Sequence, residues 1–318
     1  MIRPIGDTTV GHPADEQHPR ELARAVEALG PLLGTLEHPA EPLAGGITNR
    51  NFRVRLGGAD YVLRLPGKDT DLLGIDRRAE RAANARAAEL GIAPAVAAQL
   101  DDPPCLVTRF VQGRDMSPQE LRASAGEVAA ALRSFHDSGL RLAVAFDSFR
   151  VPLAYAATAR ARGAEPPPGF EVALAHARRI EAALSGPEHS PVPCHNDLLA
   201  ANFIHDGRLL IIDWEYAGMG DRYFDLGNFA ANNELGEADE QRLLAAYFGE
   251  QPGPRRLATL RLFRFNSDFR EAMWGVVQAT VSELDFDFDG YAARHFARMA
   301  ATAADSSFER WLAEAADD

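Results

Sequence analysis

The chain has 318 residues, of which 46% are hydrophobic and 25% charged, enough for one two-lobed unit or two small domains with filled cores. Its formal net charge of −13 disfavours nucleic acid as a partner, because that polyanion is bound through Lys and Arg, and suits a small cationic partner better. The sequence has no apolar run of membrane-spanning length, no signal-peptide pattern and only two cysteines, so we expect a soluble cytoplasmic protein without membrane contacts or a disulfide framework.

The first part of the chain predicts a small mixed lobe over residues 19–112. Residues 1–18 are rich in Pro, Gly and charged residues, and we expect them to be poorly ordered. The periodicity and the Gly and Pro breakers then predict, in chain order, a helix over 20–29, strands at 40–44, 51–56 and 61–65, a helix over 76–90, and strands at 95–100 and 105–109.

The rest of the chain, residues 113–318, is predicted to be mostly helical. The expected helices span residues 118–138, 152–161, 170–185, 223–232, 237–248, 254–284 and 290–303. The sequence therefore indicates a small lobe of strands and helices followed by a larger helical lobe.

The most informative stretch is residues 195–228. It carries Asp197, Asn202 and Asp213 at a spacing typical of phosphoryl-transfer sites. In the kinase template one Asp accepts the proton of the attacking hydroxyl, an Asn five residues on binds Mg²⁺, and a second Asp bridges the metal to the ATP phosphates. The spacing assigns Asp197 as the base and the other two residues as metal ligands.

A predicted hairpin brings these ligands together. It consists of strand-like residues 203–205 and 208–212 around the two-residue turn signal Asp206-Gly207. In this register Asn202 lies opposite Ile211, so Asp213 emerges beside Asn202, where two oxygen ligands can hold a hard cation. The alternative is an ordinary hairpin with polar ends. It does not explain why all three expected residues occur in the order of the kinase template.

Cys194 next to His195 allows another interpretation of this loop, a thiol nucleophile with a histidine base. Asp197 and Asn202 already account for the loop, so we prefer phosphoryl transfer. We expect His195 to brace the catalytic loop rather than touch substrate, and Asp225 to anchor the same loop through hydrogen bonds to its backbone.

The residues in three of these motifs indicate a protein family. The chain resembles the choline/ethanolamine kinase branch of the aminoglycoside-phosphotransferase-like kinases in the strings His195-Asn196-Asp197, Asp213-Trp214-Glu215-Tyr216-Ala217-Gly218 and Phe224-Asp225-Leu226-Gly227-Asn228. Relatives that phosphorylate antibiotics usually read His-Gly-Asp, and many lack the Glu-Tyr pair. The resemblance covers about residues 41–300 and implies an α+β, two-lobed protein-kinase-like fold with ATP and Mg²⁺ as cofactors.

The resemblance also implies a nucleotide site in the N-terminal lobe. A glycine-rich turn that presents backbone N–H groups to phosphates is expected at Gly45, Gly46, Thr48 and Asn49, although such a turn alone is more often a plain hairpin. Arg64 stands at the strand position of the phosphate-binding cation, since Lys68 lies past the strand in a turn. Glu80 is the helix acid that would orient it, unless it only pairs with neighbouring arginines. Phe110 and Val111 belong to the hinge that would contact adenine.

The last third resembles the family segment that forms an aromatic cage around a quaternary ammonium. Trp274 and Tyr291 match cage positions, Glu271 stands where a full cage has a second Trp, and Asn232 takes a further, acidic position. These departures favour primary amino alcohols over choline. The residues expected to face the substrate are Asp197, Glu215, Asn232, Glu271, Trp274 and Tyr291, with core packing as the alternative for the two aromatic residues.

We therefore expect an ATP- and Mg²⁺-dependent kinase that phosphorylates the hydroxyl of a small cationic alcohol such as ethanolamine or choline. One alternative is an aminoglycoside or other small-metabolite phosphotransferase, whose polycationic substrate would suit the acidic end at Glu314, Asp317 and Asp318. The other is a catalytically silent module of the same fold. The presence of Asp197, Asn202 and Asp213 argues against it.

Overall fold

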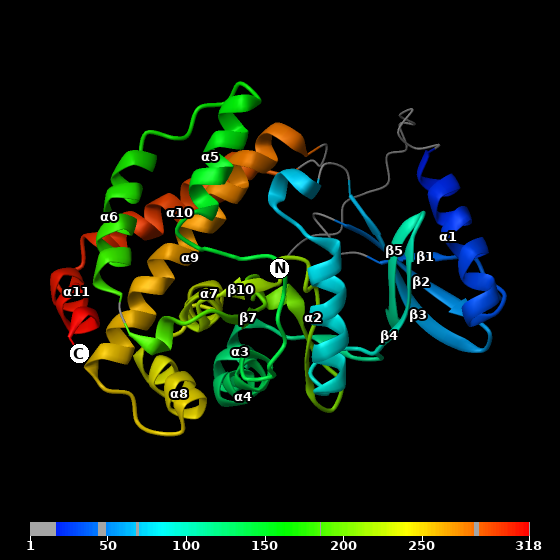
Figure 1. The fold of residues 1–318 in the computed structure, drawn as a ribbon, viewed down its shortest axis with the longest axis horizontal. Coiled ribbons are helices and arrows are strands. Elements are labelled where there is room, and N and C mark those ends of the chain that lie inside the picture. The colour runs from blue at the N-terminus through cyan, green and yellow to red at the C-terminus, as the bar shows by residue number, and fades with distance from the viewer. Residues whose placement is uncertain (1–16, 44–48, 68–69, 185, 283–285, 318) are drawn as a thin grey trace. The chain divides into compact units, whose positions relative to one another are not determined.

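The computed structural model describes residues 17–43, 49–67, 70–184, 186–282 and 286–317 (Figure 1). They form two compact units, each with a hydrophobic core of its own. The first unit holds the described residues up to Gly67 together with Val96–Phe110, and the second holds the others. Residues 1–16, most of the segment expected to be poorly ordered, lie outside the described residues, and residues 17–18 begin helix α1.

The first unit is an antiparallel sheet with one helix. The strands lie in the order β1 (Glu41–Leu43), β2 (Asn49–Leu56), β3 (Ala59–Pro66), β5 (Pro104–Arg109) and β4 (Val96–Asp101), and α1 (Gln17–Leu33) contacts β4. Alternation along β3 buries Leu63 and Leu65 against Leu29 of α1 and its neighbours, which places Arg64 on the opposite face of the sheet. The strands predicted for this region are confirmed to within three residues at each end.

Helix α2 (Arg77–Glu89) lies within the predicted N-terminal lobe but groups with the second unit. The Asp76 carboxylate caps it by accepting hydrogen bonds from two backbone N–H groups of the first turn. Its buried face is a row of small residues, Ala79, Ala83 and Ala87, which join the core of the second unit. Hydrophobic burial thus assigns α2 to the helical unit, although β3 is the strand that precedes it in the chain.

The second unit is mostly helical, as predicted. Its further helices are α3 (Pro118–Ala123), α4 (Ala125–His136), α5 (Val151–Ala161), α6 (Phe170–Ala183), α7 (Arg222–Asn232), α8 (Glu237–Phe248), α9 (Pro254–Val281), α10 (Phe288–Ala303) and α11 (Phe308–Ala316). The single helix predicted over 118–138 is divided at Ser124, and α11 was not predicted. Within the described residues, no helix combines the length and apolarity needed to cross a membrane.

Short strands hold the loops of this unit in place. They are β6 (Arg114–Asp115), β7 (Val192–Cys194), β8 (Phe203–His205), β9 (Leu209–Ile211) and β10 (Gly218–Gly220), with single 3₁₀ turns η2 (Thr70–Leu73), η3 (Pro187–His189) and η4 (Ala200–Asn202). β7 pairs with β10, and β8 lies between β6 and β9. The loop between β7 and β8 holds the first two residues of the predicted phosphoryl-transfer motif.

The hairpin predicted around Asp206-Gly207 is present, but its register is shifted by one residue. His205 pairs with Leu209, not with Arg208, so the turn contains three residues instead of two. Gly207 takes a φ of +68°, and the Asp206 N–H donates to the Arg208 carbonyl oxygen (2.9 Å). The Ile212 N–H in turn donates to the Asn202 carbonyl oxygen (2.9 Å), so Asp213 follows directly after the residue paired with Asn202.

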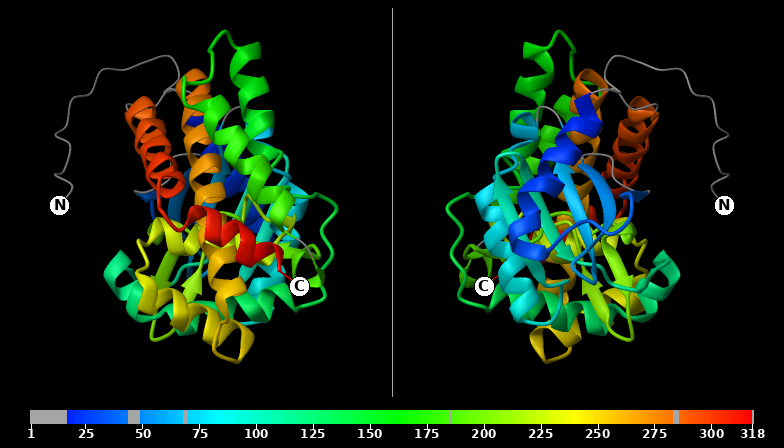
Figure 2. Two further views of the ribbon diagram at one scale, coloured as in Figure 1. Left: turned by 90° about the vertical axis from the view of Figure 1, so that its left-hand side faces the viewer. Right: turned by 90° about the vertical axis from the view of Figure 1, so that its right-hand side faces the viewer.

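Helix α9 is the central helix of the second unit. It contacts α7, α10, α11 and α5, and both views in Figure 2 show it between α10 and α5. α7 and α9 approach closely at Gly227, where a Cβ atom would lie 2.7 Å from the Cβ atom of Phe263 and 2.8 Å from its carbonyl carbon. The close approach of these two backbones therefore requires glycine at this position.

We expect Gly227→Ala to destabilise the protein by about 1–3 kcal/mol, because the added methyl group meets backbone atoms that cannot move aside cheaply. Gly126→Ala in α4 is the matched control. Its Cβ would meet only the Ala246 Cβ atom at an ordinary 3.7 Å, so the higher helix propensity of Ala should leave stability unchanged or raise it by up to about 1 kcal/mol. Urea unfolding midpoints measure both, and equal midpoints would contradict the packing argument.

Candidate active site

The loop between β7 and β8 is held by one buried carboxylate, that of Asp225 on α7. Its Oδ2 atom accepts a hydrogen bond from the His195 N–H (2.8 Å), and its Oδ1 atom accepts one from the Asn196 N–H (2.7 Å). Two successive N–H groups can point to one carboxylate because Asn196 takes a left-handed φ of +69°, which Asn tolerates better than most residues. These contacts are those expected of an anchor for the catalytic loop.

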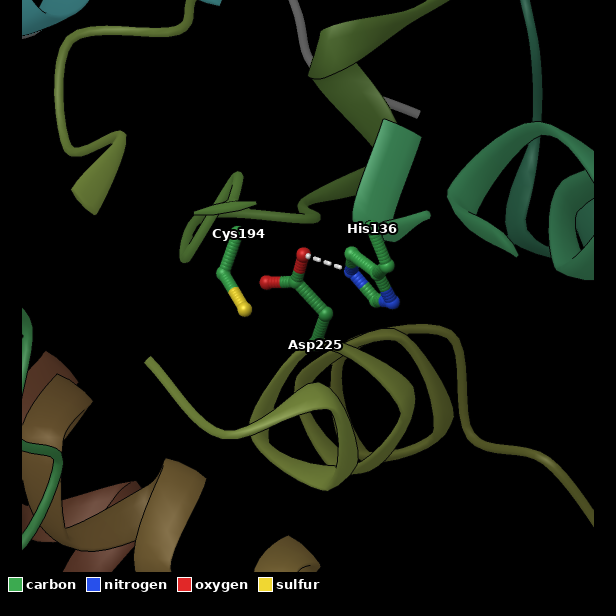
Figure 3. A group of neighbouring side chains, drawn as sticks. All are labelled: His136, Cys194 and Asp225. Carbon is green, nitrogen blue, oxygen red and sulfur yellow. Dashed lines mark hydrogen bonds and ion pairs between the residues drawn. The ribbon is translucent and has the colours of Figure 1, made fainter. Parts of the chain in front are cut away.

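A second histidine supports the anchor from behind. The His136 Nε2 atom lies 3.0 Å from Asp225 Oδ2, and its Nδ1 atom lies 2.7 Å from the Tyr247 hydroxyl oxygen. Figure 3 shows the Asp225 carboxylate between His136 and Cys194. All three side chains are fully buried or nearly so, and their possible ligand atoms lie within 4.8 Å of one another.

This cluster is nevertheless poorly suited to a metal or to thiol chemistry. Each oxygen of Asp225 already accepts a backbone hydrogen bond, and both ring nitrogens of His136 have partners. Burial raises the pKa of Cys194 well above its usual value, and the nearby Asp225 charge raises it further. A metal ligand or nucleophile must be a thiolate, so the thiol interpretation of Cys194 is not supported.

His195 connects the catalytic loop to the end of the hairpin. Its Nδ1 atom accepts a hydrogen bond from the Asp197 N–H (3.1 Å), so the ring proton is on Nε2, which donates to the Ile212 carbonyl oxygen (2.9 Å). Burial lowers the pKa of His195, which keeps the ring neutral in this arrangement. The ring thereby fixes the position of Asp197 relative to the residue before Asp213.

The Asp197 carboxyl group also lies in this loop, and only 8% of the surface of this residue is exposed. Oδ1 accepts a hydrogen bond from the Arg270 guanidinium (3.2 Å), and Oδ2 accepts one from the Asn202 side-chain amide (3.2 Å). Burial raises the pKa of Asp197 to about 8, against the opposing effect of Arg270, and the charges of Glu271, Asp213 and Glu215 add to the rise. A carboxyl group of this proton affinity is suited to accepting and releasing a proton.

The donor set around Asp197 fits a hard cation. The Asn202 amide nitrogen is occupied by the backbone and side-chain oxygens of Asp197 (2.8 and 3.2 Å), which leaves its Oδ1 atom as the group able to bind a metal. Asp213 follows the hairpin with a left-handed φ of +63° and is close enough for its charge to raise the pKa of Asp197. Carboxylate and amide oxygens are the ligands that Mg²⁺ takes in proteins.

On the other side of Asp197, α9 contributes a buried ion pair. The Nη1 atom of Arg270 that contacts Asp197 also donates to Glu271 Oε1 (2.8 Å), and the guanidinium carbon lies 4.3 Å from the ring centroid of Tyr216. The Tyr291 hydroxyl donates to Glu271 Oε2 (2.8 Å), and the Asn228 amide lies 3.4 Å from Oε1. Burial by itself raises the pKa of Glu271, but the Arg270 charge, the His295 charge and the hydrogen bonds from Tyr291 and Arg270 together outweigh it, so the pKa is lowered.

The two aromatic residues assigned to a cage are present at this ion pair. The Trp274 indole N–H donates to the Tyr216 hydroxyl (2.9 Å), and the Trp274 ring lies edge-on to Phe288 and Tyr291 at centroid distances of 5.9 and 5.6 Å. Trp274 is buried, and both rings pack against the core of the second unit. The packing explains their burial without a ligand, and their role in a cage stays a prediction.

The other predicted site residues divide between the two units. Glu215 is buried in the second unit and lies 3.2 Å from Arg77, which also pairs with Glu80 at 2.8 Å. Asn232 is a half-buried residue at the end of α7. Asn49, Arg64 and Phe110 belong to the first unit, and Val111 to the second. Gly45, Gly46 and Thr48, like Lys68, lie outside the described residues.

Sequence reasoning gave no role to Arg270, Tyr216 or Asn228, although all three contact the predicted site. Asn228 holds the loop through its Oδ1 atom, which accepts the Leu198 N–H (2.5 Å), and its amide donates to Ser267 on α9 (3.0 Å). One signal was available for Arg270. Arg270 and Glu271 are an adjacent pair of opposite charges directly before the apolar residues 272–277, and such charges are rarely buried unless paired.

We expect Asp225→Asn to lower the free energy of unfolding by about 3–5 kcal/mol, because an amide N–H₂ would face the donors that Asp225 now accepts from. Asp221→Asn, four residues earlier, is the matched control. Asp221 is the N-cap of α7, and its Oδ2 atom lies 2.6 Å from His189 Nδ1. Asn caps a helix as well and its amide can donate to the same ring nitrogen, so the cost should stay below about 1 kcal/mol. Thermal unfolding of both variants measures the difference, and similar losses would contradict the anchoring role.

A model of the phosphotransferase enzyme family matches residues 39–260. Ethanolamine kinase 2 of Homo sapiens is 37% identical over 150 residues, which is 41% of this chain and 39% of that protein, so the match spans about two fifths of the relative's length.

Solved structures match more of the chain. A choline/ethanolamine kinase family protein from Mesorhizobium loti has 28% identity and a TM-score of 0.76, covering 95% of this chain and 99% of that one. A structure of LicA in complex with AMP has 23% identity and a TM-score of 0.72, covering 89% and 97%. The family match includes both the sheet of the first unit and the loop that carries Asp197, Asn202 and Asp213. The chain therefore belongs to the phosphotransferase enzyme family.

Proposed function

We propose that this protein is an ATP- and Mg²⁺-dependent kinase that transfers the γ-phosphoryl group of ATP to the hydroxyl of a small amino alcohol. The observation that carries the proposal is the position of Asp197. Its buried carboxylate is fixed between the amide of Asn202 and the guanidinium of Arg270, on a loop that Asp225 anchors. Asp197 accepts the proton of the acceptor hydroxyl as the hydroxyl oxygen attacks phosphorus.

The metal would be held by Asn202 and Asp213, with Glu215 as a further carboxylate nearby. Bound Mg²⁺ would neutralise charge on the β- and γ-phosphates. The protein's own contribution is to hold these oxygens in place. The Asn202 amide is oriented by Asp197, and the backbone before Asp213 is held by His195 and by the pairing of Ile212 with Asn202.

The nucleotide would be bound with the help of the first unit. LicA, which has a similar fold, was solved with AMP, and the order of strands here supports a corresponding use of Arg64, Asn49 and Phe110. Gly45, Gly46 and Thr48 would contribute backbone N–H groups to the phosphates. Arg64 would contact two phosphate oxygens through its planar guanidinium. We retain Glu80 as the acid that orients this cation and Val111 as part of the adenine hinge.

An amino alcohol acceptor is supported by the names of the relatives and by the acidic surroundings of Asp197. Three further carboxylates, those of Asp213, Glu215 and Glu271, are close enough for their charges to raise the pKa of Asp197. Arg77 pairs with Glu215, and Arg270 pairs with Asp197 and Glu271. A small acceptor with an ammonium group suits such a site, and the metal would balance part of the remaining charge.

We expect Asp197→Ala to lower kcat by about 10²-fold or more, with nucleotide binding nearly unchanged, because the variant removes the general base. Asp206→Ala is the control, since Asp206 lies in the exposed turn of the following hairpin and should have no effect. An ADP-release assay gives turnover, and titration of the nucleotide gives affinity. A variant that keeps near wild-type turnover with every accepted substrate would rule out Asp197 as the base.

We expect Arg64→Lys to raise the KM for ATP without loss of folding, because a point charge replaces a planar fork that can bind two oxygens at once. Lys68→Ala removes the other basic residue near the end of β3 and should matter much less. Comparing the KM for ATP of the two variants identifies the phosphate-binding cation. A larger increase from the Lys68 change would show that Arg64 is the wrong choice.

A further inference from the structure

Glu271 on α9 is a buried carboxylate with partners from the protein on both of its oxygens. Only 1% of the residue is exposed. Oε1 accepts a hydrogen bond from Nη1 of Arg270 (2.8 Å), and the Asn228 amide lies 3.4 Å from the same oxygen. Oε2 accepts a hydrogen bond from the Tyr291 hydroxyl (2.8 Å). A buried carboxylate with a partner on each oxygen does not need a ligand to offset the cost of its burial.

Two chains of contacts connect Glu271 with the loop of Asp197. The first includes Arg270, because the Nη1 atom that contacts Glu271 also donates to Asp197 Oδ1 (3.2 Å). The second includes Asn228, whose amide faces Glu271 and whose Oδ1 atom accepts the Leu198 N–H (2.5 Å). Glu271 is therefore separated by one residue from the side chain of the proposed base, and by one residue from the backbone that follows it.

The position of Arg270 depends on this carboxylate. Its guanidinium is buried and lies over the ring of Tyr216, so its charge has to be balanced by carboxylates inside the protein. Glu271 and Asp197 share this charge through one nitrogen atom. If Glu271 were neutral, Asp197 would be the remaining carboxylate that Arg270 contacts within the described part of the chain. Arg270 would then bind Asp197 more strongly and compete with the acceptor hydroxyl for its oxygens.

We propose that Glu271 is a positioning residue for the base, which fixes Arg270 and Asn228 and through them the Asp197 carboxylate, instead of binding the ammonium group of the acceptor. The inference rests on the proposed kinase activity and on Asp197 as its base. It gives Glu271 a role in turnover and none in acceptor recognition. Tyr291 belongs to the same arrangement, because its hydroxyl holds the second oxygen of Glu271.

Glu271→Gln tests the inference with the full-length chain and Mg·ATP, because it removes the charge and keeps the shape of the side chain. We expect kcat to fall about tenfold or more, since small displacements of reacting groups have effects of this size. The fall should be the same for ethanolamine and choline, wherever the wild-type protein uses both, and each acceptor KM should change less than about threefold.

Glu240→Gln is the matched control. Glu240 on α8 is also a buried carboxylate between arginines, Arg261 (3.0 Å) and Arg264, and the substitution is the same. These arginines contact Glu240 instead of Asp197, so kcat should stay within about twofold of the wild-type value even if stability falls.

A double variant tests whether Glu271 acts through the base. Asp197→Ala removes the proposed base, so adding Glu271→Gln should lower the residual kcat by less than about twofold. A residue that binds the acceptor independently would instead multiply its loss with that of Asp197→Ala. Multiplied losses would therefore overturn the inference and leave the proposed function standing.

The remaining outcomes are also distinct. An unchanged kcat in Glu271→Gln overturns the inference, and a KM for ethanolamine raised about tenfold or more would identify Glu271 as an ammonium ligand. Wild-type protein that turns over neither alcohol overturns the proposed function and the inference with it. If Glu271→Gln does not fold, Tyr291→Phe replaces it, because this change removes only the hydroxyl that holds Glu271. It should lower kcat about threefold or more at unchanged KM, and an unchanged kcat contradicts the inference.

Discussion

The geometry of the site depends on the burial of one carboxylate, that of Asp225. Two successive backbone N–H groups of the catalytic loop and the ring of His136 all converge on it. A buried charge is tolerated only where its hydrogen bonds are complete, so the loop has little freedom to take another path. Asp225 holds the backbone of the two residues before Asp197 and thereby fixes where Asp197 lies. The conformation of this loop therefore depends on the packing of α7.

Much of this arrangement follows from local sequence. Asp197, Asn202 and Asp213 were recognisable because a strong turn lies between them, and the turn remained identifiable even though its register was one residue off. The three-residue strands β7 and β10 were not predicted, because segments of that length have no measurable periodicity. The partners of the loop, His136 and Asn228, are distant in the chain, and a sequence without the fold gives no reason to bring them together.

The pairing of charged side chains at the site was the hardest feature to predict from the sequence. In the sequence Glu271 lies one turn before Trp274, which suggests a carboxylate ligand for an ammonium group. In the structure its charge is neutralised by the residue next to it in the chain, and that pair contacts Asp197 as well. Whether a buried acid serves a substrate or a neighbour depends on side-chain directions around a helix, which adjacent positions in a sequence do not settle. The net charge of −13 likewise does not determine the sign of the charge at any one position of the site.

The absence of a side chain at Gly227 affects how the residues of this site can change between related proteins. α7 carries Asp225 and Asn228, which hold the loop of Asp197, while α9 carries Arg270, which contacts Asp197, and Glu271, which pairs with Arg270. Contact at Gly227 sets the spacing of these helices through their backbones, not through the residues at the site. Side chains elsewhere on the facing surfaces of the two helices can therefore be exchanged in the course of evolution or engineering without changing the spacing of the helices. The spacing of the two helices and the side chains that they carry are, in this respect, separately inherited traits.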